Sequence, residues 1–200
     1  QKPFCEKMYE LLGSDFSFVS TSDFSDERKM MGWNDESAPF TVQLTDGNKS
    51  EIKSLVDNAD VVIIGSAPWE LIQDRLNKGK IVFRYSERIF KNGYELSKWL
   101  PRVFSYHQKF GKYKSLYLLS ASAYTAVDYA MHGVYLNKSY KWGYFTQTKK
   151  YDTESLFKSK DKKNILWCGR FLDWKHPDEA VNLANRLKSD GYDFSLTIIG

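Results

Sequence analysis

ILWCGRFLDWKHPDEA, residues 165–180, is the stretch that decides the fold class of this chain. A short apolar run ends at Gly169, which is typical of a strand buried inside a sheet. The pattern then predicts a helix over residues 176–189, because Pro177 stands in its first turn, where a missing backbone N–H does no harm. A second apolar run over residues 195–199 predicts another strand. Strand, helix and strand in this order favour an α/β fold with a parallel sheet.

The residues upstream show the same alternation of short apolar runs and amphipathic stretches. Residues 60–66 are mostly apolar and β-branched, as expected for a strand that is buried on both faces. We expect strands over 16–20, 60–66, 80–86 and 115–120, and helices over 3–12, 50–58, 68–77 and 123–131. Because right-handed crossovers join successive parallel strands, helices are expected on both faces of a Rossmann-like sheet.

Residues 149–163 separate two such parts of the chain. The segment reads KKYDTESLFKSKDKK, which is rich in charge and poor in apolar residues, so we interpret it as a linker or a solvated helix. The chain then comprises an N-terminal Rossmann-like domain, residues 1–148, and the incomplete start of a second such domain, residues 164–200. The first residue is not Met, which leaves open that the first strand of the N-terminal domain is missing.

The composition is that of a globular protein and argues against several classes. Hydrophobic residues make up 42% and charged residues 27% of the chain, and a net charge of +4 does not by itself indicate nucleic acid. No apolar run is long enough to span a bilayer, and two distant cysteines favour a reduced, cytoplasmic protein. The sequence has no P-loop, no GxGxxG, no Asp-x-Asp and no metal-site spacing of His or Cys.

The segment between the apolar run and the following helix carries residues that suit a diphosphate. Arg170 follows Gly169 at the expected carboxyl end of a strand, where ligands of open α/β sheets bind. Lys175 stands just before a helix whose N-terminus offers free N–H groups and a partial positive charge. An arginine fork and a lysine ammonium complete such a site. The alternative is that both cations are ordinary solvated residues of a surface loop.

Gly169-Arg170 and Lys175, placed after a strand, resemble the start of the C-terminal domain of glycosyltransferase family 4, the group 1 type with the GT-B fold. The resemblance implies that Arg170 and Lys175 contact the diphosphate of a nucleotide-sugar donor, with Gly169 letting the backbone turn beside it. The chain departs from the family in one respect. His176 and Pro177 follow Lys175, where the family usually has glycine.

The same resemblance implies an acceptor-side group in the N-terminal domain. In the family, one strand of that domain often ends at a catalytic-site histidine. By the order of strands, Ser86 holds the equivalent position here, with Glu87 beside it. Glu87 is a candidate to orient or deprotonate an acceptor hydroxyl. The alternative is that Glu87 forms an ion pair with Arg84 or Arg88.

Small residues end the strand expected over residues 60–66. Gly65 and Ser66 would leave room for an acceptor at the carboxyl end of that strand. The alternative is a plain tight turn before Pro68.

The resemblance implies a glycosyltransferase of the hexosyltransferase type. Such an enzyme transfers a sugar from a nucleotide-sugar donor to a glycan or lipid-linked acceptor in polysaccharide biosynthesis, with retention of configuration and without a metal or other cofactor. We expect the chain alone to be inactive, because the family's C-terminal glutamate pair would lie beyond Gly200. The alternative is a non-catalytic α/β module that binds a nucleotide or a protein.

Residues 84–114 combine basic and aromatic side chains, which suits an anionic membrane surface. The cations are Arg84, Arg88, Lys91, Lys98, Arg102, Lys109, Lys112 and Lys114, against the acids Glu87 and Glu95. The aromatic residues are Tyr85, Phe90, Tyr94, Trp99, Phe104, Tyr106, Phe110 and Tyr113. We therefore consider a cytoplasmic protein that associates peripherally with membranes. The alternative is a solvated basic helix with its rings in the core, and no motif indicates nucleic acid as a partner.

Overall fold

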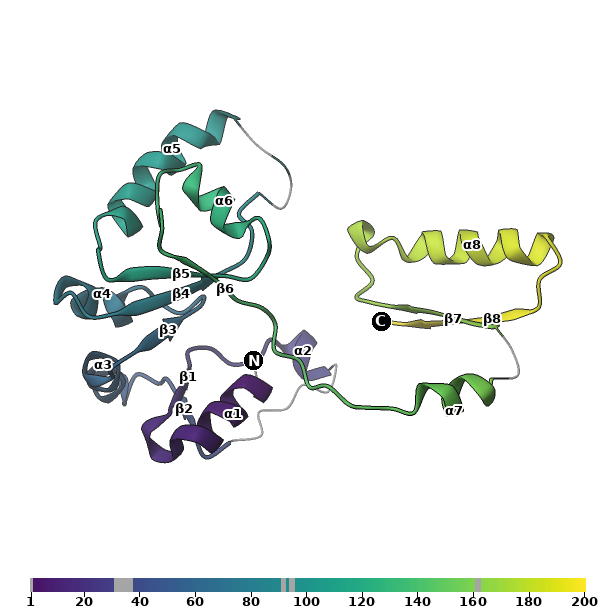
Figure 1. The fold of residues 1–200 in the computed structure, drawn as a ribbon, viewed down its shortest axis with the longest axis horizontal. Helices are drawn as coiled ribbons and strands as arrows, with labels where there is room; N and C mark the ends of the chain where they lie inside the picture. The colour runs from purple at the N-terminus through teal and green to yellow at the C-terminus, as the bar shows by residue number, and fades with distance from the viewer. Residues whose placement is uncertain (1, 31–37, 91–92, 94–95, 161–162) are drawn as a thin grey trace. The chain divides into compact units, whose positions relative to one another are not determined.

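The computed structural model describes all residues except 1, 31–37, 91–92, 94–95 and 161–162. It divides the chain into two compact units, residues 1–147 and residues 148–200, which we call unit 1 and unit 2 (Figure 1). Both units have parallel strands flanked by helices, so the expected α/β class is confirmed.

Strands and helices alternate along both units. Unit 1 contains α1 (Lys2–Leu12), η1 (Gly13–Asp15), β1 (Phe18–Ser20), α2 (Asp26–Met30), β2 (Thr41–Gln43), α3 (Lys49–Asn58), β3 (Val62–Ile64), α4 (Glu70–Asn77), β4 (Val82–Ser86), α5 (Leu96–Tyr106), the π-helical turn η2 (His107–Gly111), β5 (Leu116–Ser120), α6 (Thr125–Ala130) and β6 (Ser139–Lys141). Unit 2 contains α7 (Thr153–Lys158), β7 (Lys163–Cys168), η3 (Asp173–Lys175), α8 (Pro177–Ser189) and β8 (Phe194–Ile199).

The main sheet of unit 1 is parallel, with its strands in the order β3, β4, β5 and β6. The register pairs Val82 of β4 with Leu116 of β5, and Ser86 with Ser120. Since all four strands run in the same direction, their carboxyl ends meet at one edge of the sheet. This edge, which we call the carboxyl edge, is where ligands of open α/β sheets bind.

One face of the main sheet forms the core of unit 1. Val82, Leu116 and Leu118 are fully buried on this face, and each such side chain stabilises the fold by about 1.5–3 kcal/mol. Residues of α4, η2 and α6 complete the cluster, namely Ile72, Leu76, Phe110 and Tyr129, with Ile64, Tyr113, Val134 and Tyr135. On the opposite face, the rings of Phe83 and Tyr117 contact each other at 5.4 Å and are only partly buried.

Arg75 of α4 is a fully buried cation that ties several elements together. Its guanidinium donates to the backbone oxygens of Val56 at 3.0 Å, Asp60 at 2.7 Å and Ile81 at 2.9 Å, and also to that of Ala59. The first of these carbonyls belongs to the last turn of α3, where the helix dipole favours a positive charge. Burial lowers the pKa of Arg75 from its ordinary value.

The strand predicted over residues 16–20 does not belong to the main sheet. β1 pairs in parallel with β2 in a separate two-stranded sheet, in which Phe18 lies opposite Thr41. Sequence patterns missed β2 (TVQ) and β6 (SYK) because each is short and neither contains a run of apolar residues that would indicate a strand. They also missed α5 as an element, which contains Pro101, a residue that normally interrupts a helix.

Unit 2 is a strand–helix–strand unit, and one exposed helix precedes it in the sequence. β7 and β8 pair in parallel from Lys163 opposite Phe194 to Cys168 opposite Ile199, and α8 covers one face of the pair (Figure 1). No described residue of unit 2 is fully buried. The expected linker contains α7, which is solvated and begins where the Asp152 side chain accepts a hydrogen bond from the Ser155 N–H. Two residues of this expected linker, 161 and 162, lie outside the described residues.

Candidate functional site

The first candidate region lies at the carboxyl end of β7. Gly169 follows the last residue of the strand, and its N–H donates to the Ile199 oxygen at 2.9 Å, which extends the ladder by one bond. The chain turns at once, because the Leu172 N–H donates to the Arg170 oxygen at 2.8 Å. The Arg170 side chain is exposed at this turn. Strand end, turn and arginine therefore occur together, as the sequence pattern predicts.

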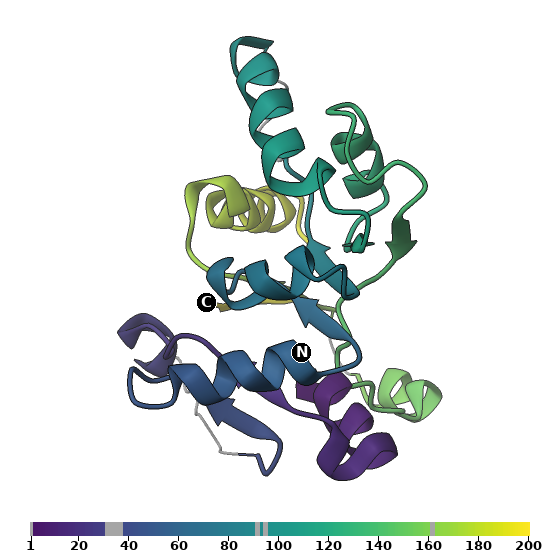
Figure 2. The same cartoon turned by 90° about the vertical axis from the view of Figure 1, so that its left-hand side faces the viewer.

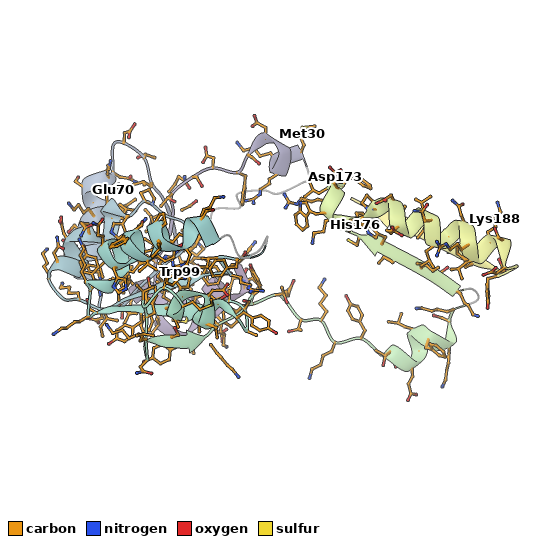
Figure 3. The ribbon with its side chains drawn as sticks, turned by 90° about the horizontal axis from the view of Figure 1, so that it is seen from above. Met30, Glu70, Trp99, Asp173, His176 and Lys188 are labelled. Atoms are coloured by element: carbon orange, nitrogen blue, oxygen red, sulfur yellow. The ribbon has the colours of Figure 1, made fainter. Side chains whose placement is uncertain are left out.

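The same turn leads into α8 through η3, which ends at Lys175. Figure 3 shows Asp173 and His176 at one end of α8 and Lys188 at the other. The Lys175 ammonium lies 4.6 Å from the centre of the Trp174 ring, and its side chain is exposed. Arg170 and Lys175 are therefore both solvent-accessible cations on the short connection between β7 and α8.

His176 is the N-cap residue of α8 and has an unusual backbone conformation. Its φ is 50° and its ψ is 54°, which is the left-handed region that a residue with a Cβ enters at a cost of about 1–2 kcal/mol. No side chain caps the helix, and Pro177 at its start has no N–H. The N–H groups of the first turn are therefore not bound by a capping side chain. Asp178 and Glu179 place two carboxylates on that turn.

The second candidate region is the carboxyl edge of the main sheet in unit 1. Gly65 and Ser66 directly follow β3 and are exposed, and Ser86 is the last residue of β4. A methyl group added at Gly65 would lie 3.9 Å from Tyr85 Cδ1, so Gly65 lies beside the end of β4. The structure thus brings the two predicted acceptor-side segments to one edge of one sheet.

The hydroxyl of Ser86 belongs to a directed chain of hydrogen bonds. Arg84 Nη1 donates to Tyr129 Oη at 2.6 Å, and Tyr129 Oη lies 2.9 Å from Ser86 Oγ. Ser86 Oγ donates to the backbone oxygen of Glu87 at 3.0 Å. A guanidinium can only donate hydrogen bonds, and a carbonyl oxygen can only accept them. The Tyr129 hydroxyl therefore accepts from Arg84 and donates to Ser86, and the Ser86 hydroxyl donates to the backbone oxygen. The Ser86 proton is therefore engaged, and the bond supports the position of Glu87.

Glu87 lies half-buried just beyond the end of β4. Its neighbour Tyr85 has a pKa above the ordinary value, because burial disfavours the phenolate and the negative charge of Glu87 disfavours it further. A carboxylate just beyond the end of a strand can accept a hydrogen bond from a ligand hydroxyl.

A buried ion pair that sequence patterns did not indicate holds the loop after β4. Asp128 of α6 is fully buried, and its carboxylate contacts Arg88 Nε at 3.1 Å. The same carboxylate accepts a bond from the Phe90 N–H at 3.4 Å. The backbone oxygen of Asp128 accepts a bond from His132 Nδ1 at 2.8 Å. The spacing of Asp128 and His132, one helical turn apart, was the available signal, but it does not identify Arg88 as the partner.

Two cavities of unit 1 are lined by none of the predicted donor-side or acceptor-side residues. One of about 350 Å³ is lined by Leu76, Gly79 and Ser115, which lie near the amino ends of β4 and β5. Another of about 180 Å³ lies between η2 and the loop after α6. Within the part of the chain that the structure describes, no group of three or more His, Cys, Asp and Glu side chains is placed to hold a metal ion.

No family model, curated protein or solved structure matches the chain.

Proposed function

We propose that the protein is a nucleotide-sugar-dependent glycosyltransferase of the GT-B type, with its donor diphosphate at the β7–α8 connection. The observation that carries this proposal is the set of groups on that connection. Gly169 directly follows β7, Arg170 and Lys175 are exposed cations, and no side chain of the N-cap residue caps the first turn of α8. An arginine guanidinium, a lysine ammonium and a helix N-terminus are complementary to the negative charge of a diphosphate.

The conformation of His176 supports the resemblance at the position where the sequence departs from it. The family usually has glycine after the lysine, and glycine enters the left-handed region without steric cost. His176 adopts that region here, with φ of 50°. The backbone thus has the geometry that glycine favours, although the side chain differs.

The proposed reaction uses these cations in the transition state. When the bond between the sugar and the diphosphate breaks, the leaving nucleoside diphosphate gains negative charge. Arg170 and Lys175 stabilise that charge more in the transition state than in the bound donor, and this difference accelerates the reaction. On this proposal the enzyme needs no metal and transfers the sugar with retention, to a glycan or lipid-linked acceptor in polysaccharide biosynthesis.

On the acceptor side, we assign the direct role to Glu87 and a supporting role to Ser86. The Ser86 hydroxyl already donates to the backbone of Glu87, so it supports the position of that residue. Glu87 then orients the acceptor hydroxyl, and the absence of side-chain bulk at Gly65 and the small side chain of Ser66 leave space for it.

The test is a calorimetric titration of the protein with a panel of nucleoside diphosphates and sugar nucleotides. We expect saturable binding that Arg170→Ala and Lys175→Ala each weaken by roughly ten- to hundredfold, since a hydrogen bond to a charged group contributes about 1.5–3 kcal/mol. Lys188→Ala is the matched control, because Lys188 is exposed at the opposite end of α8 (Figure 3). If the folded protein binds none of the panel, or if all three variants bind alike, the proposed site is wrong.

A non-catalytic binding module remains the second candidate, and one observation favours it. In unit 2, the sheet face away from α8 exposes Leu166 and Ile199, which are 63% and 53% accessible. Apolar side chains exposed on one sheet face are typical of a surface that another protein covers. Sugar release from a bound donor separates the two candidates when it is measured on a protein that also carries the family's C-terminal glutamate pair, because the chain alone is expected to be inactive. A module would bind the nucleotide without hydrolysing or transferring the sugar.

A further inference from the structure

Charge is distributed unevenly along unit 1. Residues 1–60 contain twelve acids and six Lys or Arg, namely Glu6, Glu10, Asp15, Asp23, Asp26, Glu27, Asp35, Glu36, Asp46, Glu51, Asp57 and Asp60 against Lys2, Lys7, Arg28, Lys29, Lys49 and Lys53. Residues 96–147 contain one acid, Asp128, and seven Lys or Arg, namely Lys98, Arg102, Lys109, Lys112, Lys114, Lys138 and Lys141. The second segment is therefore strongly cationic.

The single acidic residue of this segment is buried in the structure. Asp128 is fully buried and bound to Arg88. Residues 97–147 are all described, and they expose no carboxylate to solvent. Within residues 97–147, the surface of α5, η2, α6 and β6 therefore exposes Lys and Arg side chains and no carboxylate, which favours anionic partners.

Helix α5 presents apolar side chains on this positive surface. Its inner side carries Trp99 and Tyr106, whose rings lie 6.4 Å and 5.2 Å from the ring of His132. Its outer side carries Leu100 and Phe104, one turn apart, which are 59% and 71% exposed. Figure 2 shows α5, in teal, on the outside of unit 1.

Exposed cations lie on and just after the same helix. Lys98 is exposed on α5, and Lys109 and Lys112 are exposed on and after η2. Along the sequence, Leu100 and Phe104 come between Lys98 and Lys109. Helices that lie in the membrane interface combine such residues, with apolar side chains among the lipids and ammonium groups at the headgroups. None of the described helices is long and apolar enough to cross a bilayer.

We propose that α5 is a docking surface for an anionic lipid membrane, with Leu100 and Phe104 inserted at the headgroup level and Lys98, Lys109 and Lys112 on anionic headgroups. The proposal does not depend on sugar transfer. A membrane fits better than nucleic acid, because an aliphatic residue such as Leu100 gains nothing from a phosphate backbone.

The structure also narrows the set of cations that the sequence indicated. Arg84 lies half-buried with its guanidinium 4.7 Å from the centre of the Phe110 ring, and Arg88 is bound to Asp128. Neither arginine belongs to the docking surface. Lys91, Tyr94 and Glu95 lie outside the described residues.

The experiment is co-sedimentation of the whole chain with vesicles of phosphatidylcholine alone and of phosphatidylcholine with about 30% phosphatidylglycerol. We expect binding to the anionic vesicles that is at least tenfold stronger and that falls with added salt, since each basic residue near the surface adds to the attraction. We expect L100S/F104S and K98E/K112E each to weaken it about tenfold or more. All four side chains belong to residues with exposed surface, and an unchanged thermal melt by circular dichroism verifies the fold of each variant.

The matched control is M30S/K49E, which makes the same kinds of change on the acid-rich part of unit 1. Met30 is 89% exposed and Lys49 is exposed. The control should bind anionic vesicles like the unaltered chain. The proposal would be overturned if the chain bound neutral and anionic vesicles equally well. It would also be overturned if M30S/K49E lost as much vesicle affinity as L100S/F104S or K98E/K112E. A single-stranded oligonucleotide that binds more tightly than the vesicles, with loss in K98E/K112E but not in L100S/F104S, would assign the surface to nucleic acid instead.

Discussion

Tyrosines of the unit 1 core are kept neutral by the fold. Tyr135 is 7% exposed, and burial raises its pKa far above the ordinary value, while the nearby charge of Arg84 offsets this only in part. Burial also raises the pKa of Tyr106 and of Tyr85. In each case the fold favours the protonated phenol, so the unfolded chain releases these protons at a lower pH than the folded chain.

This difference predicts alkaline destabilisation. Below about pH 10, the ordinary pKa of tyrosine, the contribution of Tyr135 is fully present. Above that pH the unfolded state loses the phenolic proton of Tyr135 first, so the free energy of unfolding falls by about 1.4 kcal/mol per pH unit from this tyrosine. Urea denaturation from pH 8 to pH 11 should show a shallower decline for Tyr135→Phe than for the unaltered chain.

Tyr144→Phe is the control for this measurement, because Tyr144 is 61% exposed. Its pH dependence should match that of the unaltered chain. Equal slopes for Tyr135→Phe and the unaltered chain would show that Tyr135 titrates alike in both states.

At the level of elements, the first turn of α8 combines two opposing effects. Asp178 and Glu179 stabilise the N-terminus of the helix by about 0.3–1 kcal/mol each through the helix dipole. The same carboxylates repel a diphosphate bound at that end. The two carboxylates therefore increase the stability of the helix and lower its affinity for the proposed ligand.

The double variant D178N/E179Q should therefore bind nucleoside diphosphates several times more tightly and have slightly lower helix stability. Calorimetry measures the first effect and thermal denaturation measures the second. Asp190→Asn, just past the other end of α8, is the control and should leave the affinity unchanged. Unchanged affinity in the double variant would show that the phosphates do not lie at this helix end.

At the level of the whole molecule, the two units differ in how they bury their side chains. Unit 1 has a contiguous cluster of buried residues drawn from β3, β4, β5 and the helices around them. Unit 2 has no fully buried residue among those described. Ordering each residue costs about 1.5 kcal/mol, and apolar burial has to offset that cost.

We therefore predict that residues 1–147 fold cooperatively on their own, whereas residues 148–200 alone are largely unfolded. Circular dichroism with urea titration of the two fragments and of the whole chain tests this. The unit 1 fragment should show a sigmoidal transition close to the main transition of the whole chain. A cooperative transition in the isolated unit 2 fragment would contradict the prediction.

Sequence by itself determined the features that depend on local order. The alternation of apolar runs and amphipathic stretches predicted the α/β class, β3, β4, β5, β7 and β8, because strand and helix periodicity is a property of neighbouring residues. Gly169, Arg170 and Lys175 fall on one short connection for the same reason, since a strand end and a helix start bound the segment. Their role with a diphosphate stays a prediction.

Only the tertiary structure decided which distant groups meet. Arg88 and Asp128 are forty residues apart in the chain, and the packing of α6 against the main sheet brings them together. The same packing engages the Ser86 hydroxyl with Tyr129, so Ser86 supports Glu87. Strand pairing likewise separated β1 from the main sheet. Hydrogen bonds and ion pairs are set by distances across the fold, and residue order along the chain does not contain those distances.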